Sequence, residues 1–484
     1  MAAMGLWMLA CLALLLVVTG LPAWIVLIGV SLAFAAAGLA ADVLALPLLT
    51  ALPARLIGLL EHDLLQALPL YVLMGALLNR LPLAETLFRA GCRAFGGGRA
   101  GASLAGLGLG VLLAPMNGSV GASVSMLSRT VMPRLDASGM NAERSAALVC
   151  VASTFGVVVP PSLVLILLGD TMLRAHTEAI NATGLAVRVI NTQDVFRGAL
   201  IPAAIMLFLC GLTAWWQNRA DVVAGEKLPS PAVSRRDWAV AGFTAIFIAG
   251  LLGSVTLGYL YAVEAAATGG MALLLFGLAS GALTMPVLRD VLRDTMALSG
   301  ALFALLLGAN TFTLILRAYG TDRWVAGLLA NLGGGEQMAL LVVLLILGIC
   351  ALVLDAFEMI FVVIPVVLPP LLMLVPDATW VAVLTLLILQ TSFLLPPFGY
   401  AVLMVRNARP LQSRRLSRAL LPFLIVQLTV LALVIACPSI VYRDTPAQPA
   451  NRDAIADPAM GDLQKQLQLQ TSGAEDSKDK LPSN

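Results

Sequence analysis

Two segments in opposite halves of the sequence carry residue types that suit ion binding. In residues 153–162 a Ser-Thr pair precedes two consecutive prolines, and in residues 390–399 a Thr-Ser pair does the same. Proline lacks a backbone N–H and collides with the carbonyl one turn back, so two in a row must unwind a helix and free its carbonyl oxygens. These oxygens and the hydroxyls suit a cation such as Na⁺, while a helix N-terminus at the break suits an anionic group. The alternative is a kink that serves only packing.

Each of these segments follows an apolar stretch with a polar break near its middle. Residues 100–133 are interrupted at 116–119, and residues 337–375 are interrupted at 355–358. Backbone can leave the helix at membrane depth only where protein or a water-filled cavity satisfies its polar groups. We therefore expect two re-entrant helical hairpins with a binding site at each break. A kinked span is the alternative in each case.

The elements that position these breaks belong to an all-α polytopic membrane protein. Of the 484 residues, 60% are hydrophobic and 12% are charged, and the mean hydropathy is +0.95. Soluble proteins carry roughly 25% charged residues, so a soluble enzyme, a secreted disulfide scaffold, a nucleic-acid binder and a disordered chain are excluded. The six cysteines form no CxxC pair and the two histidines lie in polar loops, so we expect neither a zinc site nor an enzyme.

The charge distribution orients the chain in the membrane. Residues 406–418 hold five arginines and no acid, which indicates a cytoplasmic loop. Working outward from it, we predict ten crossings at about 4–19, 24–48, 65–79, 145–169, 198–218, 238–257, 264–286, 296–316, 378–405 and 419–441. The cytoplasmic loops, 80–99, 129–144, 219–237, 287–294 and 406–418, then hold 18 of the 29 basic residues. Both termini are expected outside, in the periplasm.

The crossings divide into two inverted repeats, each with five transmembrane helices and one re-entrant hairpin. The first covers residues 1–218, with a hairpin at about 100–133 and a Pro-Pro helix at 145–169. A cytoplasmic linker, 219–237, leads to the second over 238–442, with a hairpin at about 337–375 and a Pro-Pro helix at 378–405. The polar tail 443–484 is expected to be disordered. Inverted repeats with paired broken helices are typical of secondary transporters with a site at the midplane.

A set of motifs runs along the chain between about residues 5 and 440. They are Leu68–Arg80, Asn117-Gly118-Ser119 with Pro133, Ala152-Ser153-Thr154 leading into Pro160-Pro161-Ser162, Asp355 with Pro365, and Pro396-Pro397-Phe398-Gly399. In this order they resemble the large membrane subunit of TRAP (tripartite ATP-independent periplasmic) transporters, a DctM-like family. The resemblance implies an elevator-type permease of the bacterial inner membrane that imports a small carboxylate with a Na⁺ gradient. It also implies a small four-helix membrane subunit and a periplasmic substrate-binding protein as partners.

The same resemblance implies which residues form the sites. The Na⁺ ligands would be Asn117, Gly118, Ser119, Thr154, Gly156 and Val159 in the first half, and Asp355, Thr391, Ser392 and Leu394 in the second. The substrate cavity would be lined by Asn117, Ser153, Ser162, Asn310, Asp355 and Gly399. The sequence departs from the usual family pattern where Asn117 begins the first hairpin turn and where Leu395 precedes the last two prolines.

Several of these residues could instead have a purely structural role. Asn117 and Ser119 could be helix caps, since Asn and Ser are preferred there, and Glu358 could cap the second arm of its hairpin. Asp355 and Glu358 are the only ionisable residues in 337–376. A carboxylate at membrane depth is energetically costly and is by default a functional residue with a cationic partner. The polar segment 170–197 is expected to be an external loop that either contacts the binding protein or is simply solvated.

Other functions compete with a TRAP permease. A stand-alone anion/sodium symporter or a sodium/proton antiporter could share the broad fold. An antiporter would need a proton-carrying carboxylate in each half, and the first hairpin and its Pro-Pro helix have none. A membrane enzyme would need a nucleophile–base pair or a metal cluster inside the bundle, and a purely structural subunit would have no need of paired broken helices.

Overall fold

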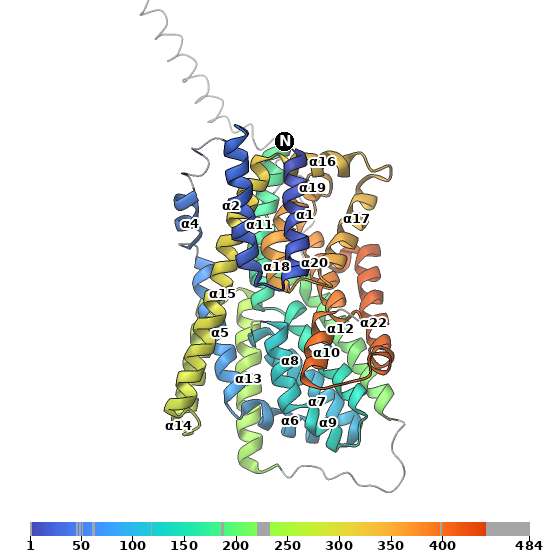
Figure 1. Cartoon of the computed structure of the whole chain (residues 1–484). Helices are drawn as coiled ribbons and strands as arrows, with labels where there is room; N and C mark the ends of the chain where they lie inside the picture. Colours follow the sequence, from blue (N-terminus) through green and yellow to red (C-terminus); the bar gives the residue numbers. More distant parts are fainter. Residues whose placement is uncertain are drawn as a thin grey trace, which may run out of the picture.

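The structure is a computed structural model that describes residues 2–44, 47, 50, 52–60, 63–117, 119–184, 188–219, 233–396 and 399–441. Within these residues every regular element is a helix (Figure 1). Eight of the described helices are long and apolar enough to span a bilayer, and a ninth span results if the bent pair α5 and α6 is counted as one. The all-α polytopic class predicted from the sequence is confirmed.

The helices of the two halves follow one another in a similar order. Those of the first half are α1 (Ala2–Thr19), α2 (Ala23–Ala40), α4 (Leu52–Leu60), α5 (Asp63–Arg80), α6 (Leu83–Ala94), α7 (Gly98–Leu113), η1 (Pro115–Asn117), α8 (Val120–Thr130), α9 (Met132–Ala137), α10 (Ala142–Val158), α11 (Leu163–Thr183) and α12 (Thr192–Arg219). Those of the second half are α13 (Arg235–Leu257), α14 (Ala262–Ala279), α15 (Met285–Ala318), α16 (Thr321–Ala330), α17 (Gly335–Cys350), α18 (Ala356–Glu358), η2 (Met359–Val363), α19 (Ile364–Leu374), α20 (Ala378–Leu394), α21 (Tyr400–Ala408), α22 (Ser413–Ala436) and η3 (Pro438–Ile440).

Both polar breaks and both Pro-Pro segments interrupt helices as predicted. The first hairpin runs through α7, a 3₁₀ turn, α8 and α9, and the second through α17, α18, a π-helical turn and α19. In Figure 1 the first hairpin lies in the lower half of the molecule and the second in the upper half. The Pro-Pro segments separate α10 from α11 and α20 from α21. The chain is therefore non-helical at four places inside the bundle.

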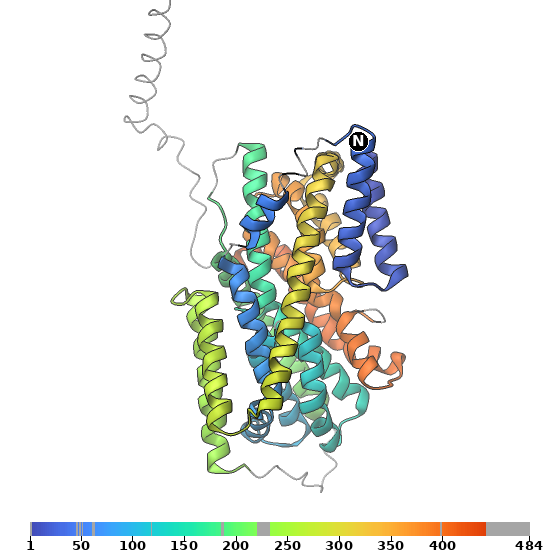
Figure 2. The same cartoon turned by 60° about the vertical axis from the view of Figure 1, so that its left-hand side comes forward.

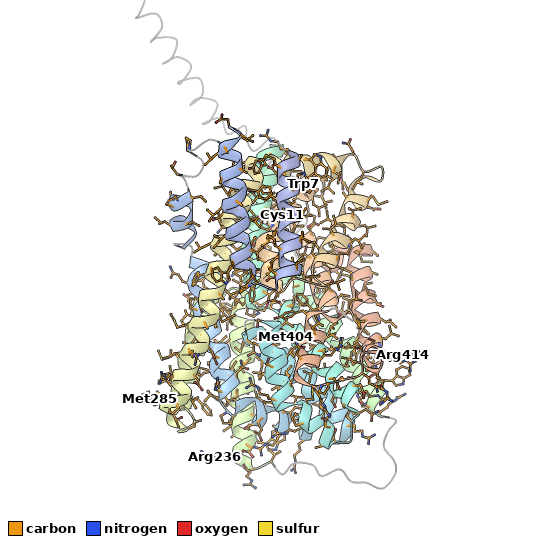
Figure 3. The ribbon with its side chains drawn as sticks, viewed as in Figure 1. Trp7, Cys11, Arg236, Met285, Met404 and Arg414 are labelled. Atoms are coloured by element: carbon orange, nitrogen blue, oxygen red, sulfur yellow. The ribbon has the colours of Figure 1, made fainter. Side chains whose placement is uncertain are left out.

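The centre of the bundle is formed by α10 and α20. Every residue of α10 from Ser145 to Val158 is buried, and α20 is buried along most of its length. The outer helices instead turn large apolar side chains outward, as Phe243 and Ile246 of α13 do with 72% and 75% exposure. Trp7 and Met285 lie on the outside in the same way (Figure 3). Such a surface suits lipid rather than water.

Helices of the first half pack against helices of the second half in reciprocal pairs. α2 packs along α15 while α14 packs along α5, a pairing that Figure 2 shows from the side. α11 contacts α19 of the second hairpin, and α21 contacts α8 of the first. α1 contacts α16, and α13 contacts α6. Each contact between the halves thus has an equivalent contact in which the corresponding helix of the other half takes each role.

The two ends of the described chain pack against other helices than the arginine-rich segment 406–418 does. Gly5 packs against Thr321 at the start of α16, and Val441 lies against Gly198 near the start of α12. Arg409 instead forms an ion pair of 2.5 Å with Asp136 in α9, where the first hairpin finishes.

The observed helices differ from the predicted crossings near α14, α15 and α2. α15 is 34 residues long and contains the predicted loop 287–294, because Arg80 of α5 pairs with Asp290 at 3.1 Å and with Asp294 at 2.9 Å. The chain turns earlier than predicted, at Gly281, whose φ of +69° favours glycine. α2 ends at Ala40 rather than near 48.

The predicted external loop 170–197 is largely wrong, because α11 continues to Thr183. Two ion pairs support the helix there. Asp170 pairs with Arg174 one turn later at 3.0 Å, and Glu178 pairs with Arg317 of α15 at 2.7 Å. Their charges are satisfied by helix packing, so the polar composition does not break the helix.

Candidate functional site

The tip of the first hairpin buries an amide. Asn117 is 2% exposed, and its side-chain nitrogen donates to the Ser123 hydroxyl at 3.2 Å. Its amide oxygen has no hydrogen-bond partner among the described residues. Ser119 begins α8, and its hydroxyl accepts the Ala122 N–H at 3.1 Å, so this residue is a helix cap. Gly118 lies outside the described residues.

The first helix break places several oxygens beside this hairpin. Thr154 donates its hydroxyl proton to the Val151 carbonyl at 2.9 Å, and Ser153 donates to the Cys150 carbonyl at 2.8 Å. Both hydroxyls are fully buried and keep lone pairs free. Val159 ends α10 in an extended conformation, so the helix stops one residue before the prolines.

Two carbonyls at this break lose their usual donors. Those of Gly156 and Val157 would accept the N–H groups of residues 160 and 161, which are prolines. Gly156 also lies so close to the first hairpin that a Cβ here would meet the Ala114 carbonyl oxygen at 2.6 Å. Beyond the break, Ser162 caps α11 by accepting the Leu165 N–H at 3.1 Å. The break therefore combines free carbonyls with a capped helix N-terminus.

The second helix break has a similar construction. Thr391 donates to the Leu387 carbonyl at 2.8 Å, and Ser392 is 4% exposed. α20 ends at Leu394, and α21 begins after Gly399. A Cβ on Gly399 would lie 2.5 Å from the Phe393 carbonyl oxygen, so only glycine fits here. Pro397 and Phe398 lie outside the described residues.

The tip of the second hairpin carries the two carboxylates. Asp355 precedes α18, and its backbone N–H donates to the Glu358 carboxylate at 3.2 Å. Asp355 is the N-cap residue of α18, and Glu358 completes a capping box with it, which is the capping role that the sequence allowed for Glu358. One carboxylate oxygen of Asp355 is buried without a hydrogen-bond partner among the described residues. A π-helical turn, η2, follows directly, and such turns are frequent at functional sites.

Tyr400, which the sequence analysis did not single out, joins the second helix break to the first hairpin. It is the first residue of α21, and its ring lies 6.3 Å from that of Phe393. Its hydroxyl is close enough to α8 that a Cβ on Gly121 would meet it at 3.0 Å. The sequence offered one signal for it, its position directly after the Pro-Pro-Phe-Gly motif.

The candidates from the two halves are joined at α21 rather than scattered. Besides the contact of Tyr400 with α8, the Cys150 thiol of α10 lies 3.6 Å from the Ala401 carbonyl oxygen of α21. Gln390, one turn before the second break, is fully buried, and both its amide atoms lack a partner among the described residues. Asn310 lies apart from the other candidates, on α15. Its backbone carbonyl accepts a hydrogen bond from the Thr313 hydroxyl, and within the described ranges its side chain forms no hydrogen bond with the other candidates.

The sequence was compared with protein families and with characterised relatives. Residues 9–440 match the family described as "Tripartite ATP-independent periplasmic transporter, DctM component". A C4-dicarboxylate TRAP transporter large permease protein from Pseudomonas aeruginosa is 25% identical, with 78% of this chain and 86% of that one covered. The 2,3-diketo-L-gulonate TRAP transporter large permease protein of Escherichia coli is 21% identical, with 78% and 85% covered.

One further relative and one solved structure match this chain over different shares of their own length. An isethionate TRAP transporter permease protein, DctMQ, of Oleidesulfovibrio alaskensis is 23% identical, and the match covers 78% of this chain but 57% of that one. Among solved structures, the Alcanivorax borkumensis YdaH transporter superposes with a TM-score of 0.61 at 16% identity, covering 83% of this chain and 90% of that one. This structural likeness concerns the fold alone. The family match spans nearly all the described helices, and the chain therefore belongs to the DctM family, the large permease component of tripartite ATP-independent periplasmic transporters.

Proposed function

We propose that this TRAP permease subunit couples the import of a small carboxylate to Na⁺. The observation that carries the proposal is the meeting of the two interrupted helices with the two hairpin tips, where free carbonyls, buried hydroxyls and an unpartnered carboxylate oxygen gather. The described residues hold no cluster of His, Cys, Asp and Glu side chains of the kind that binds transition metals. Oxygen ligands of this kind suit a hard cation.

The first Na⁺ site would lie between the first hairpin and α10. Its ligands would be the unpartnered amide oxygen of Asn117, the Thr154 hydroxyl, and carbonyls from Gly156 to Val159. Ser119 would contribute through its backbone, because its hydroxyl already caps α8. A cation here would satisfy the amide oxygen and the carbonyls that the prolines leave without donors.

The second Na⁺ site would lie between the second hairpin and α20. Asp355 would supply the only formal charge, and Thr391, Ser392 and the Leu394 carbonyl would complete the shell. A bound Na⁺ would offset the desolvation of the buried carboxylate. The sites differ in charge, since the first has an amide where the second has a carboxylate.

The substrate carboxylate would bind where α11 and α21 begin. The N-termini of these helices, at Ser162 and Gly399, carry partial positive charge that favours an anion. The Tyr400 hydroxyl would donate a hydrogen bond to it, and Ser153 would line the same cavity. The P. aeruginosa and E. coli relatives are named for a C4-dicarboxylate and for 2,3-diketo-L-gulonate, which are organic acids.

Two inverted repeats would explain the exchanged packing of the halves. A pseudo-two-fold axis in the membrane plane would relate the contact of α2 with α15 to that of α14 with α5, and the contact of α11 with α19 to that of α21 with α8. Movement of the hairpins and broken helices against the remaining helices would then give an elevator-type mechanism. The reciprocal contacts support this arrangement for both halves.

The partners would be a separate small membrane subunit and a periplasmic binding protein. The isethionate relative carries the name DctMQ, and the match covers 57% of its length, which leaves room there for a second subunit in the same chain. A smaller chain that plays that part would complete this permease. Membership in the DctM family disfavours a stand-alone symporter or antiporter.

Reconstitution tests the proposal. Proteoliposomes with this chain, its small membrane partner and the loaded binding protein should accumulate a radiolabelled carboxylate when Na⁺ is high outside. Replacement of Na⁺ by K⁺ should stop uptake. Uptake that persists without Na⁺ and follows a proton gradient alone would contradict Na⁺ coupling, whereas uptake without the binding protein would contradict the tripartite arrangement.

A further inference from the structure

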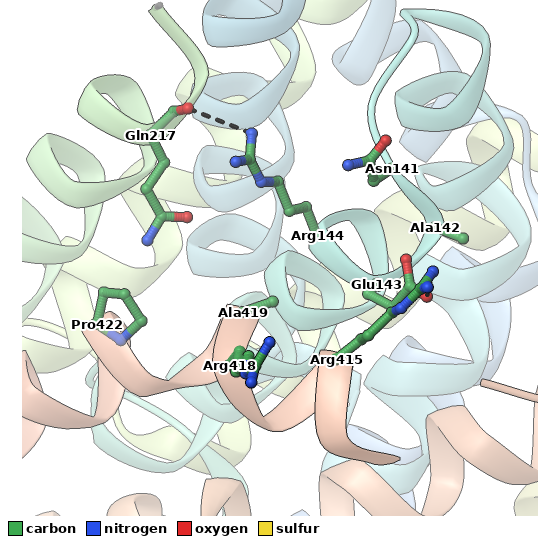
Figure 4. A pocket seen from close by; sticks show the side chains of 9 residues that line it. All are labelled: Asn141, Ala142, Glu143, Arg144, Gln217, Arg415, Arg418, Ala419 and Pro422. Carbon is green, nitrogen blue, oxygen red and sulfur yellow. Dashed lines mark hydrogen bonds and ion pairs between the residues drawn. The ribbon is translucent and has the colours of Figure 1, made fainter. Parts of the chain in front are cut away.

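A cavity remote from the interrupted helices opens where α10 and α22 begin and α12 ends. It has a volume of about 740 Å³, within the roughly 300–1,000 Å³ of small-molecule sites. Asn141, Glu143 and Arg144 line it from the start of α10, and Gln217 lines it from the last turns of α12. α22 contributes the remaining residues, which include Arg415, Arg418 and Pro422 (Figure 4).

The lining of this cavity is positively charged. Among the described residues that line it, three arginines accompany one acid, Glu143, which lies 3.9 Å from Arg415, at the long limit of an ion pair. Arg418 sits on the next turn of α22 and forms no ion pair with any residue of the described ranges. Arg144 reaches across to the Gln217 carbonyl oxygen at 3.5 Å (Figure 4). The cavity therefore offers guanidinium groups from two helices to an anion, and such groups match phosphate geometry well.

Two tryptophans mark the depth of the cavity in the membrane. Trp215 and Trp216 directly precede Gln217 in α12 and are 41% and 63% exposed. The guanidinium of Arg219 lies 4.9 Å from the Trp215 ring centre, as expected for a cation–π contact. Exposed Trp side chains at the end of a spanning helix are typical of the membrane–water interface. The arginines thus lie at the level of lipid headgroups.

Apolar helix faces continue from the cavity into the membrane. Leu421 and Ile425 follow the cavity residues of α22 and are 54% and 56% exposed. Phe208 and Leu212 of α12, which packs against α22, are exposed in the same way. A ligand with a phosphate head and acyl chains fits a basic cavity followed by such faces.

We propose that this cavity binds the headgroup of an anionic phospholipid such as phosphatidylglycerol. The phosphate would lie between Arg144, Arg415 and Arg418, and the acyl chains along the exposed faces of α12 and α22. Basic pockets between membrane helices are known to hold anionic headgroups. The inference depends on the fold and the membrane, and it is independent of Na⁺ coupling and of the substrate.

Lipid binding to the full-length protein in detergent micelles tests the site. Titration with phosphatidylglycerol should raise the thermal unfolding midpoint and give a saturable bound lipid in native mass spectrometry. Phosphatidylcholine should give neither effect. Arg418→Gln should weaken phosphatidylglycerol binding about fivefold, as expected from the loss of one basic residue near a headgroup. Glu143→Gln should strengthen binding, because it removes an acid that lines the cavity beside Arg415.

Arg414→Gln is the matched control, because Arg414 is an exposed arginine on the same helix that does not line the cavity (Figure 3). It should leave binding unchanged. Equal losses from Arg414→Gln and Arg418→Gln would overturn the proposal in favour of a diffuse surface charge. Equal binding of the two lipids would also overturn it. Inorganic phosphate at millimolar concentration that reproduces the full stabilisation would identify a free-anion site instead.

Discussion

Asp355 is an acidic residue whose side chain is partly buried at the tip of the second hairpin. One of its carboxylate oxygens is buried without a partner among the described residues, although its hairpin lies in an apolar bundle. Asn117 holds the matching place in the first hairpin and leaves its own amide oxygen unpartnered. Each tip therefore presents one unsatisfied oxygen, and one of the two belongs to an acid. Capping does not account for these two oxygens. Ser119, and not Asn117, caps α8, and one Asp355 oxygen stays unpartnered although Asp355 is the N-cap residue of a capping box with Glu358.

We expect Asp355→Asn to fold and assemble but to bind Na⁺ less well. The amide keeps the shape of the side chain and loses its charge, so the Na⁺ concentration for half-maximal transport should rise about tenfold, equal to about 1.4 kcal/mol. Asp355→Leu removes the oxygen and should abolish transport. Na⁺-titrated uptake, normalised to membrane-inserted protein, measures both effects. Glu336→Gln, which removes an exposed acid at the start of α17, should titrate like the wild type. An unchanged titration in Asp355→Asn would count against the assignment.

A substitution of Tyr400 can show whether its hydroxyl serves substrate binding or the stability of the fold. Tyr400→Phe keeps the ring contact with Phe393 and removes the hydroxyl that lies beside α8 of the first hairpin. We expect the KM for the carboxylate to rise about tenfold with little loss of folded protein, since one hydrogen bond to a charged group contributes about 1.5–3 kcal/mol. Uptake kinetics measure the change.

The control for Tyr400→Phe is Tyr319→Phe, which removes a hydroxyl that donates to the Phe34 carbonyl at 2.6 Å, away from the breaks. It should lower the unfolding temperature and leave KM unchanged. If both variants lose stability and neither changes KM, Tyr400 is a packing residue.

Some site residues were predicted from the sequence and others were not. The difference is whether a local sequence pattern marks the residue. Consecutive prolines and carboxylates in an apolar run violate local rules, so the Pro-Pro breaks and Asp355 stand out without any knowledge of the fold. Tyr400 and Gln390 violate nothing locally. The place of Tyr400 at the site comes from a neighbour far away in the sequence, Gly121, and only the tertiary packing brings the two together.

At the scale of helices, the first hairpin packs against α10 through close backbone contact. A Cβ on Gly110 of α7 would lie 2.5 Å from the Ala152 carbonyl oxygen, and one on Gly156 of α10 would lie 2.6 Å from that of Ala114. Glycines at these two positions let α7 and α10 approach as membrane helices do where small residues meet. The first hairpin and the first broken helix thus form one packed unit.

Gly156→Ala should therefore disturb both folding and ion binding. The added methyl must displace the Ala114 backbone, which costs about 1–3 kcal/mol, and it moves the hairpin tip away from the free carbonyls. We expect a lower unfolding temperature and a weaker apparent affinity for Na⁺. Gly108→Ala in α7 is the matched control, because a Cβ there meets nothing within 4 Å. Gly156→Ala with wild-type stability and Na⁺ affinity would show that the close approach is dispensable.

Helix boundaries were predicted less well than the breaks between them, for an electrostatic reason. Charged residues were read as loops at 287–294 and at 170–183, yet both segments are helical. In each, the acids face an arginine of another turn or another helix, Arg80 in one case and Arg174 and Arg317 in the other. Composition alone cannot reveal such pairing, because the partner can be more than 100 residues away.

For the whole molecule, the positions of the chain ends and of the arginines define a single orientation. Near its start the described chain packs against α16 through Gly5 and Thr321, and at its end it packs against α12 through Val441 and Gly198. The arginine-rich segment 406–418 adjoins the first hairpin through Arg409 and Asp136. Positive charge is retained on the cytoplasmic side during insertion. The first hairpin should therefore open toward the cytoplasm and the second toward the periplasm.

Reporter fusions measure this orientation in intact cells. Alkaline phosphatase fused after Val441 should be active, because it is exported, whereas green fluorescent protein fused at the same point should be dark. The reverse should hold for fusions in the linker after Arg219, whose neighbours Trp215 and Trp216 mark the opposite membrane surface. The argument depends on charge, so neutralising all five arginines of 406–418 should weaken the bias and give a mixed population. A phosphatase fused after Val441 that stays inactive, paired with a bright fluorescent fusion, would reverse the orientation and place the lipid cavity on the periplasmic side.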